Sequence, residues 1–129
     1  MSFNKNMRVF IVDDYNTMLR IMRNLLRQLE IDNVEEATDG DTAFRMIQKN
    51  PPELIISDWN MQPVTGLDLL RKVRADAKLR HIPFIMVTAE SKTENVIVAK
   101  QSGVSNYIVK PFNAETLRAK IASVCVATA

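Results

Sequence analysis

The feature that most constrains this chain is the regular alternation of short apolar runs with longer amphipathic segments. Each run stops abruptly at a polar residue, and several are continuously apolar and β-branched, as strands buried on both faces should be. The runs are Arg8–Val12, Asn33–Ala37, Leu54–Ser57, Phe84–Thr88 and Asn106–Val109. Alternation on this spacing favours a parallel sheet with helices on both faces.

The segments between these runs have the periodicity of amphipathic helices. The first carries apolar residues on one face, namely Met18, Met22, Leu25, Leu26 and Leu29, and arginines on the other, namely Arg20, Arg23 and Arg27. The last has an apolar stripe of Ala114, Leu117, Ile121 and Val124. Asn113 precedes it as an N-cap, and Gly103 stands where another helix end favours a left-handed residue.

The sequence therefore predicts one α/β domain over residues 1–129, doubly wound, with five strand–helix repeats and right-handed crossovers. Residues 1–7 are short and polar, so we expect a flexible N-terminal segment there. We expect no attached output domain.

Polar side chains stand at the ends of four of these five predicted strands. They are Asp13 and Asp14 after the first strand, Asp58 after the third, Thr88 at the end of the fourth and Lys110 after the fifth. In a parallel sheet these ends share one edge, which is where open α/β sheets bind ligands. Each residue alone could be a solvated cap, but their joint arrangement predicts a site.

The three carboxylates at this edge repel one another and are costly to bury unpaired. A divalent cation removes that conflict, and a few hard oxygen ligands completed by water favour Mg²⁺. Lys110 could then pair with a phosphate oxygen, and the Thr88 hydroxyl could donate a hydrogen bond to another. Phosphoryl transfer to an aspartate requires these groups and no separate base, because a carboxylate is already a nucleophile.

Composition narrows the class of protein. The chain of 129 residues is 47% hydrophobic and 25% charged, and its net charge of +2 does not favour nucleic acid as a partner. The single cysteine, Cys125, allows no internal disulfide and is best explained as a small packing residue. Apolar runs are too short for a signal peptide or a membrane span. We therefore expect a cytoplasmic monomer without membrane insertion.

The strand ends carry four recognisable motifs: Val12-Asp-Asp14, Asp58-Trp-Asn-Met61, Val87-Thr-Ala-Glu90 and Tyr107-Ile-Val-Lys-Pro-Phe112. With these motifs the chain resembles the response-regulator receiver family nearly end to end, and within it the single-domain chemotaxis regulators. The resemblance implies the flavodoxin-like strand order 2-1-3-4-5 and a cis Lys110-Pro111 bond. It also implies a phosphoacceptor switch rather than an enzyme, fed by a sensor histidine kinase or a phosphotransfer domain.

The resemblance assigns roles to the acidic residues. It implies that Asp58 is the phosphoacceptor and that Asp14, Asp58 and the backbone carbonyl of Asn60 bind Mg²⁺ directly. Asp13 would act mainly through a metal-bound water. Asn60 and Glu90 would flank the path of attacking water, which implies a short-lived aspartyl phosphate.

The resemblance also assigns the switch and the output surface. Lys110 would bind the phosphoryl group, Thr88 would move toward it, and the small Ala89 would let a backbone N–H approach it. Tyr107 would turn inward when Thr88 moves, although it could be an ordinary strand aromatic. The implied contacts for a downstream protein, such as a flagellar motor switch, are Lys92, Val96, Lys100, Tyr107 and Lys120, although the lysines could be merely solvated.

Two features leave alternatives open. Gln62 stands where the family usually has the proline after Met61, and the proline here is Pro63. Gln62 is either solvated, which we favour, or contacts the phosphoryl group, a kinase or a phosphatase. The arginine face of the first helix is likewise either solvated or a docking surface for the kinase.

Other function classes fit less well. A flavin-binding module is disfavoured because the loop Asp13–Thr17 lacks the glycines and hydroxyls that cradle a phosphate. A haloacid-dehalogenase type of enzyme would need an aspartate at position 60, which is Asn60. A phosphate sink for a shared kinase and a phosphorylation-independent docking domain remain open.

Overall fold

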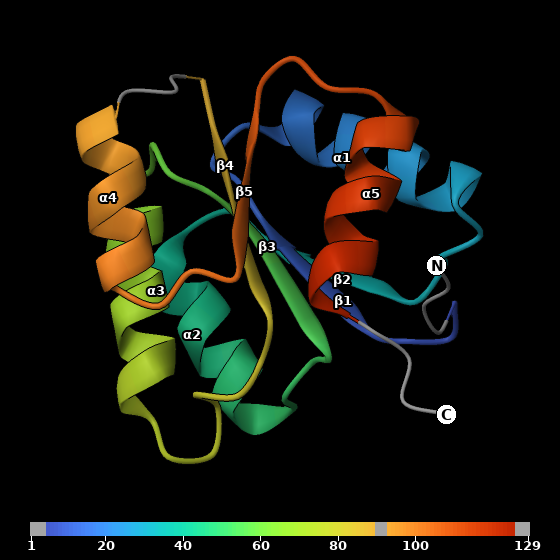
Figure 1. Ribbon diagram of the computed structural model, residues 1–129. Helices are drawn as coiled ribbons and strands as arrows, with labels where there is room; N and C mark the ends of the chain where they lie inside the picture. Colours follow the sequence, from blue (N-terminus) through green and yellow to red (C-terminus); the bar gives the residue numbers. More distant parts are fainter. Residues whose placement is uncertain (1–4, 90–92, 126–129) are drawn as a thin grey trace.

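The computed structural model describes residues 5–89 and 93–125. Within this part, strands and helices alternate five times (Figure 1). The elements are β1 (Val9–Val12), α1 (Asn16–Gln28), β2 (Val34–Ala37), α2 (Gly40–Lys49), β3 (Leu54–Asp58), α3 (Gly66–Ala75), β4 (Phe84–Thr88), α4 (Thr93–Gln101), β5 (Asn106–Val109) and α5 (Ala114–Val124). Every predicted strand is confirmed to within one residue at each end.

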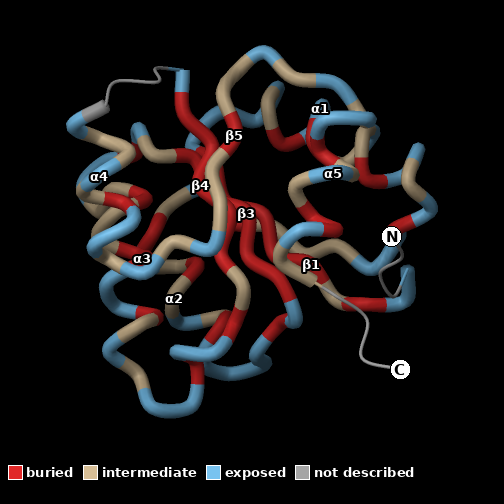
Figure 2. The backbone as a smooth tube through the Cα atoms, in the orientation of Figure 1, coloured by how far each residue is buried: buried red, intermediate tan, exposed pale blue. Residues whose placement is uncertain are grey.

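The strands form one parallel sheet in the order β2-β1-β3-β4-β5, which confirms the flavodoxin-like order. Helices α1 and α5 cover one face of the sheet, and α2, α3 and α4 cover the other (Figure 1). This doubly wound arrangement buries the central strands on both sides, and buried residues follow them in Figure 2. It explains why β1, β3 and β4 have nearly unbroken apolar sequences.

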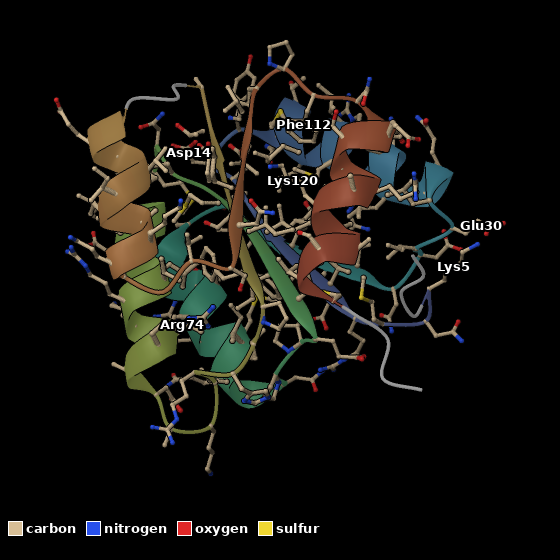
Figure 3. All side chains as sticks on the ribbon, in the orientation of Figure 1. Lys5, Asp14, Glu30, Arg74, Phe112 and Lys120 are labelled. Carbon is tan, nitrogen blue, oxygen red and sulfur yellow. The ribbon has the colours of Figure 1, made fainter. Side chains whose placement is uncertain are left out.

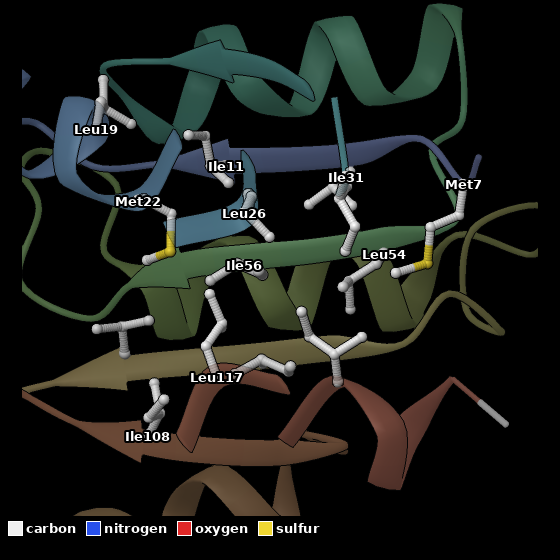
Figure 4. Packing of buried hydrophobic residues seen from close by; sticks show 14 residues of the cluster. Met7, Ile11, Leu19, Met22, Leu26, Ile31, Leu54, Ile56, Ile108 and Leu117 are labelled. Carbon is white, nitrogen blue, oxygen red and sulfur yellow. The ribbon is translucent and has the colours of Figure 1, made fainter. Parts of the chain in front are cut away.

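The core has two layers because successive strand residues point to opposite faces of the sheet. In β1, Val9 and Ile11 join the cluster under α1 and α5, shown in Figure 4, whereas Phe10 and Val12 join the cluster on the other face. Burying each large side chain of this kind stabilises the fold by about 1.5–3 kcal/mol. The two clusters together fix the register of the strands, and thus the position of the residues at their ends.

The apolar face of α1 is rotated slightly from the predicted one. Its buried residues are Leu19, Met22 and Leu26. The residues Met18, Leu25 and Leu29 are half-buried at its margins. The prediction omitted Leu19, which begins the series at i, i+3 and i+7 that faces the sheet.

The signals predicted at two helix ends, Asn113 and Gly103, are confirmed, and α3 has a cap that the sequence analysis did not name. The side chain of Asn113 accepts a hydrogen bond from the Thr116 N–H at 2.8 Å and so caps α5. Thr65 and Asp68 form a reciprocal capping box at the start of α3. Gly103 has φ +94°, the left-handed conformation expected after α4.

Three further features of the fold bear on the predictions: the burial of Met7, the cis peptide bonds before two prolines and the lengths of the helices. Met7, in the segment expected to be flexible, is 3% exposed, so the packed core includes it. The Lys110-Pro111 bond is cis, as the resemblance implies, and the Gln62-Pro63 bond is cis as well. In the described part of the chain, no helix is long and apolar enough to cross a membrane.

Candidate functional site

The carboxyl ends of β1, β3, β4 and β5 bring the predicted residues to one edge of the sheet. Backbone hydrogen bonds extend the strand pairing beyond the strands: Asp13 N–H donates to Ala37 O at 3.3 Å, and Lys110 N–H donates to Thr88 O at 2.8 Å. Figure 3 shows Asp14 at this edge, above the sheet. The fold thus gathers residues that are far apart in the sequence.

The three predicted carboxylates form one cluster. Asp13, Asp14 and Asp58 each offer a carboxylate oxygen, and these oxygens lie within 4.8 Å of one another. Asp13 is 5% exposed and Asp58 4% exposed, whereas Asp14 is exposed at the rim. Two buried negative groups and one exposed one are therefore concentrated at a single point.

Lys110 supplies the positive charge at this cluster. Its Nζ lies 3.0 Å from Asp58 Oδ1 and 3.7 Å from Asp13 Oδ2. One ammonium faces two buried carboxylates and an exposed third, so the cluster keeps an excess of negative charge. Thr88, at the end of β4, is buried beside it at 7% exposure.

The pKa values of the buried carboxyls report this crowding. The pKa of Asp13 is raised from 3.8 to about 6, chiefly by burial and next by the charge of Asp58, while the Tyr15 N–H and Lys110 oppose the rise. Burial also raises the pKa of Asp58, while Lys110 opposes the rise. Lys110 therefore does not compensate fully for desolvating the two carboxylates.

One oxygen of the cluster lacks a well-directed hydrogen bond. Asp58 Oδ1 is buried and has no well-directed hydrogen bond among the described residues; its charged neighbour there is the Lys110 ammonium, whose Nζ lies 3.0 Å away. An orphaned anionic oxygen beside two further carboxylates is the donor set that a hard cation binds. The residues present therefore fit Mg²⁺.

A depression of about 330 Å³ adjoins the cluster. It is lined by Asp14, Trp59, Asn60, Met61, Gln62 and Thr65. Asn60 and Gln62 are exposed there, and Trp59 is half-buried. Sequence reasoning weighed Gln62 but missed Trp59 and Thr65 as wall residues; their only local signal was their proximity to Asp58.

Gly66 is a further residue that sequence reasoning missed. A Cβ added to it would lie 2.1 Å from the carbonyl oxygen of Asp58 and 2.9 Å from Trp59 Cα. The Gly66 N–H donates to Trp59 O at 3.0 Å. The first turn of α3 thus packs directly on the backbone of Asp58, which requires a residue without a side chain. A glycine at the start of a helix beside a predicted site could have suggested this contact.

The predicted output residues that the structure describes lie on α4, β5 and α5, away from the carboxylate cluster in sequence: Val96, Lys100, Tyr107 and Lys120. Tyr107 is half-buried, and Lys120 Nζ lies 5.3 Å from the centre of its ring. On α4, Val96 is half-buried and Lys100 exposed. Ile97, which sequence reasoning did not name, is 48% exposed there.

Several predicted residues lie away from the cluster, outside the described part of the chain or in a contact that the sequence did not predict. Ala89 is exposed directly after β4, whereas Glu90 and Lys92 lie outside the described residues. In the arginine face of α1, Arg23 is not free: it pairs with Glu36 and donates to Val34 O at 3.1 Å.

The remaining arginines of this face, Arg20 and Arg27, are exposed. Cys125 is half-buried against the α1–α5 core cluster, and burial raises the pKa of its thiol to about 11, as suits a packing residue.

Comparison with known proteins gives a consistent result. Residues 9–122 match the model of the response regulator receiver domain family. The chain is 52% identical over 118 residues to chemotaxis protein CheY-3 of Vibrio cholerae, covering 92% of this chain and 91% of that protein. It is 51% identical over 115 residues to chemotaxis protein CheY of Pseudomonas aeruginosa, covering 89% and 93%.

Solved structures show the same fold. The chemotaxis protein CheY4 of Vibrio cholerae superimposes with a TM-score of 0.86 at 33% identity, covering 92% of this chain and 98% of that one. The receiver domain of a sensor histidine kinase from Pseudomonas aeruginosa, solved with a magnesium ion in its active-site cleft, has a TM-score of 0.86 at 23% identity. The match covers 95% of this chain and 99% of that one.

Proposed function

Because the chain belongs to the response-regulator receiver family, we propose that it accepts a phosphoryl group on Asp58 from a histidine kinase or a phosphotransfer domain. The observation that carries the proposal is the geometry at Asp58. Its carboxylate is buried at the sheet edge, lies 3.0 Å from Lys110 Nζ and shares the cluster with two further carboxylates. Few structural roles require such an arrangement, since it is costly to bury.

The residues divide the chemistry between them. A carboxylate oxygen of Asp58 attacks the phosphorus while the donor nitrogen leaves on the opposite side. Lys110 moves from pairing with Asp58 to pairing with a phosphoryl oxygen, which keeps a cation beside the new negative charge. The Thr88 hydroxyl and the backbone N–H of Ala89 would donate to the remaining oxygens.

Asp13, Asp14, Asp58 and the carbonyl of Asn60 would hold Mg²⁺ in this site. When bound, Mg²⁺ supplies positive charge that neutralises the phosphoryl oxygens during transfer. The exposed Asp14 forms the accessible side of the cluster, and the buried Asp13 would act through a bound water. The protein is then a switch that catalyses its own modification and its slow reversal, rather than an enzyme that turns over a substrate.

The signal would leave through the α4–β5–α5 surface. Thr88 would move toward the phosphoryl group and Tyr107 would turn inward, which changes the surface that Val96, Lys100 and Lys120 form with it. The relatives named as chemotaxis proteins favour a downstream protein in flagellar motor control, reached in the cytoplasm. A phosphate sink for a shared kinase needs the same residues at the site and is the second candidate.

A phosphorylation assay tests the acceptor. The protein should gain one phosphoryl group, seen as a mass increase in intact-protein mass spectrometry, when treated with a small phosphodonor and Mg²⁺. Asp58→Asn should abolish the increase while keeping the circular dichroism of the native fold. Modification that persists in folded Asp58→Asn protein would overturn the assignment.

The output is tested by capture of partner proteins with and without beryllofluoride and Mg²⁺. Recovery of a motor switch protein only in the activated state supports motor control, and recovery of kinases alone supports the sink. If beryllofluoride causes no change in the spectra of the protein, phosphorylation-independent docking replaces both.

A further inference from the structure

The depression lies beside the carboxylate cluster that contains Asp58, where the proposed phosphoryl transfer would take place. Asp14 at its rim has a carboxylate oxygen within 4.8 Å of one of Asp58, and Trp59 and Asn60 follow Asp58 directly. In phosphoryl transfer the leaving group lies in line, on the far side of phosphorus from the attacking oxygen. The volume of about 330 Å³ matches that of small-ligand sites.

The lining of the depression favours one class of leaving group. Among the described residues that line it, Asp14 is the one ionisable side chain, so the charge of the lining itself is negative and repels an anion. The side chains of Asn60, Gln62 and Thr65 can accept and donate hydrogen bonds, and the half-buried indole of Trp59 offers an aromatic surface. A neutral planar ring that donates an N–H suits this lining better than a carboxylate does, because Asp14 repels a second negative charge.

The loop that carries Gln62 is fixed on its C-terminal side. Val64 packs so closely on α2 that a Cβ added to Gly40 would lie 2.6 Å from its Cγ1. Thr65 is held by its capping box with Asp68, whose N–H donates to Thr65 Oγ1 at 3.1 Å. Gln62 therefore projects from an anchored loop at the wall of the depression, and is not merely part of a long solvated segment.

We infer that this depression is a leaving-group pocket for the imidazole of a phosphohistidine, with Trp59 as its stacking surface and Gln62 as the residue that distinguishes imidazole from other leaving groups. The inference rests on the proposed function and deepens it. It also gives a role to the position at which this chain departs from the usual family pattern.

The step balances without a further reactant. An Asp58 oxygen forms the O–P bond, and the P–N bond breaks with its electron pair passing to the ring nitrogen. The second ring nitrogen keeps its proton, so neutral imidazole leaves. The Gln62 side-chain oxygen would accept a hydrogen bond from that N–H, whereas acetyl phosphate would release an acetate anion, which the nearby Asp14 carboxylate repels.

The test compares two small phosphodonors, monophosphoimidazole and acetyl phosphate, on the full chain with Mg²⁺. The measured quantity is the phosphorylation rate constant with monophosphoimidazole divided by that with acetyl phosphate. Both donors carry the same phosphoryl group, so a change in the attraction for that group cancels in the ratio. Gln62→Glu should raise the ratio and Gln62→Lys should lower it, each by about threefold, as expected for an exposed charge near a polar group. The same two changes at Gln48, exposed on α2, are the matched control and should leave the ratio unchanged.

Each outcome bears on a different claim. If no donor modifies any variant, the proposed function fails. If all variants are modified but the ratio does not respond at position 62, or responds equally at position 48, the pocket assignment is overturned. If position 62 alters transfer from a kinase but not the ratio, Gln62 contacts the partner protein and the pocket assignment is again wrong.

A binding measurement gives a second readout that does not depend on phosphorylation. Imidazole added to the protein should shift the NMR signals of the Trp59 indole N–H and the Gln62 side-chain amide, and acetate should shift them less. Shifts spread evenly over the surface would overturn the pocket.

Discussion

Replacing Asp13 with asparagine should stabilise the metal-free protein at neutral pH. Its carboxyl has a pKa of about 6 in the folded protein and an ordinary value of 3.8. Between these values the folded state binds more protons than the unfolded state, so stability falls as pH rises through this window. Above pH 6 the carboxyl is ionised in both states, and its ionisation lowers the free energy of unfolding by the full amount that the pKa shift represents.

The size of the effect follows from the shift. Each pKa unit corresponds to about 1.4 kcal/mol, so a shift to about 6 sets an upper limit near 3 kcal/mol at pH 7. Asparagine keeps the oxygen that accepts the Tyr15 N–H at 3.0 Å but loses the attraction to Lys110 at 3.7 Å. We therefore expect a net gain of about 1–3 kcal/mol at pH 7.

The assay is urea unfolding of metal-free protein, followed by circular dichroism at pH 7 and pH 4. At pH 4 the folded carboxyl is already neutral, so the gain from Asp13→Asn should nearly vanish. Asp14→Asn is the matched control, since Asp14 is exposed and water already screens its charge; its gain should be smaller. A gain of equal size at both pH values, or a loss at pH 7, would refute the electrostatic reasoning.

Four further outcomes are expected. Mg²⁺ should raise the unfolding free energy of the wild type more at pH 7 than at pH 5, because protons compete for the carboxylates; equal shifts in thermal unfolding would contradict a carboxylate site. Gly66→Ala should cost about 3 kcal/mol or more, since its Cβ would collide with the Asp58 carbonyl, and should slow modification of the remaining folded protein. Arg74→Met should cost about 1–3 kcal/mol in urea unfolding, because Arg74 donates to Gly103 O at 2.8 Å and to another carbonyl at 2.7 Å. Lys120→Met should cost at most about 1 kcal/mol, with altered NMR signals confined to the neighbourhood of the aromatic ring beneath it.

The sequence was sufficient for the strands and for the polar residues at their ends because the relevant signals are local, whereas the order of the strands came from the resemblance to the receiver family. An unbroken apolar run such as Ile55-Ile56 can be buried on both faces only in a central strand, and the run ends one residue after Ser57, at Asp58. The helix faces were less certain. In α1, a stripe centred on Met22 can be drawn with either Met18 or Leu19 at its margin, and only packing on the sheet decides between them.

Contacts between distant segments could not be predicted in this way. Arg74, near the end of α3, donates hydrogen bonds to the carbonyl oxygens of Gly103 and Ile82, and no local pattern in the sequence predicts these partners. The packing of Gly66 on the Asp58 carbonyl likewise depends on the path of the intervening loop. Periodicity describes the face an element presents, but not which loop a particular side chain reaches.

The repulsion between the buried carboxylates affects both the stability of the protein and the chemistry proposed for its site. Asp13 and Asp58 are buried with raised pKa values, and Lys110 offsets only part of their mutual repulsion. A cation at this site would reduce the repulsion between the buried carboxylates, and this adds to its affinity for the folded protein. Phosphorylation of Asp58 would draw Lys110 from the carboxylates to the new charge. Asp13→Asn should therefore have opposite effects on two measurements, raising the stability of the metal-free protein while weakening its affinity for Mg²⁺. If the variant gained stability and bound Mg²⁺ as tightly as the wild type, the strain at Asp13 would be structural and unrelated to the site.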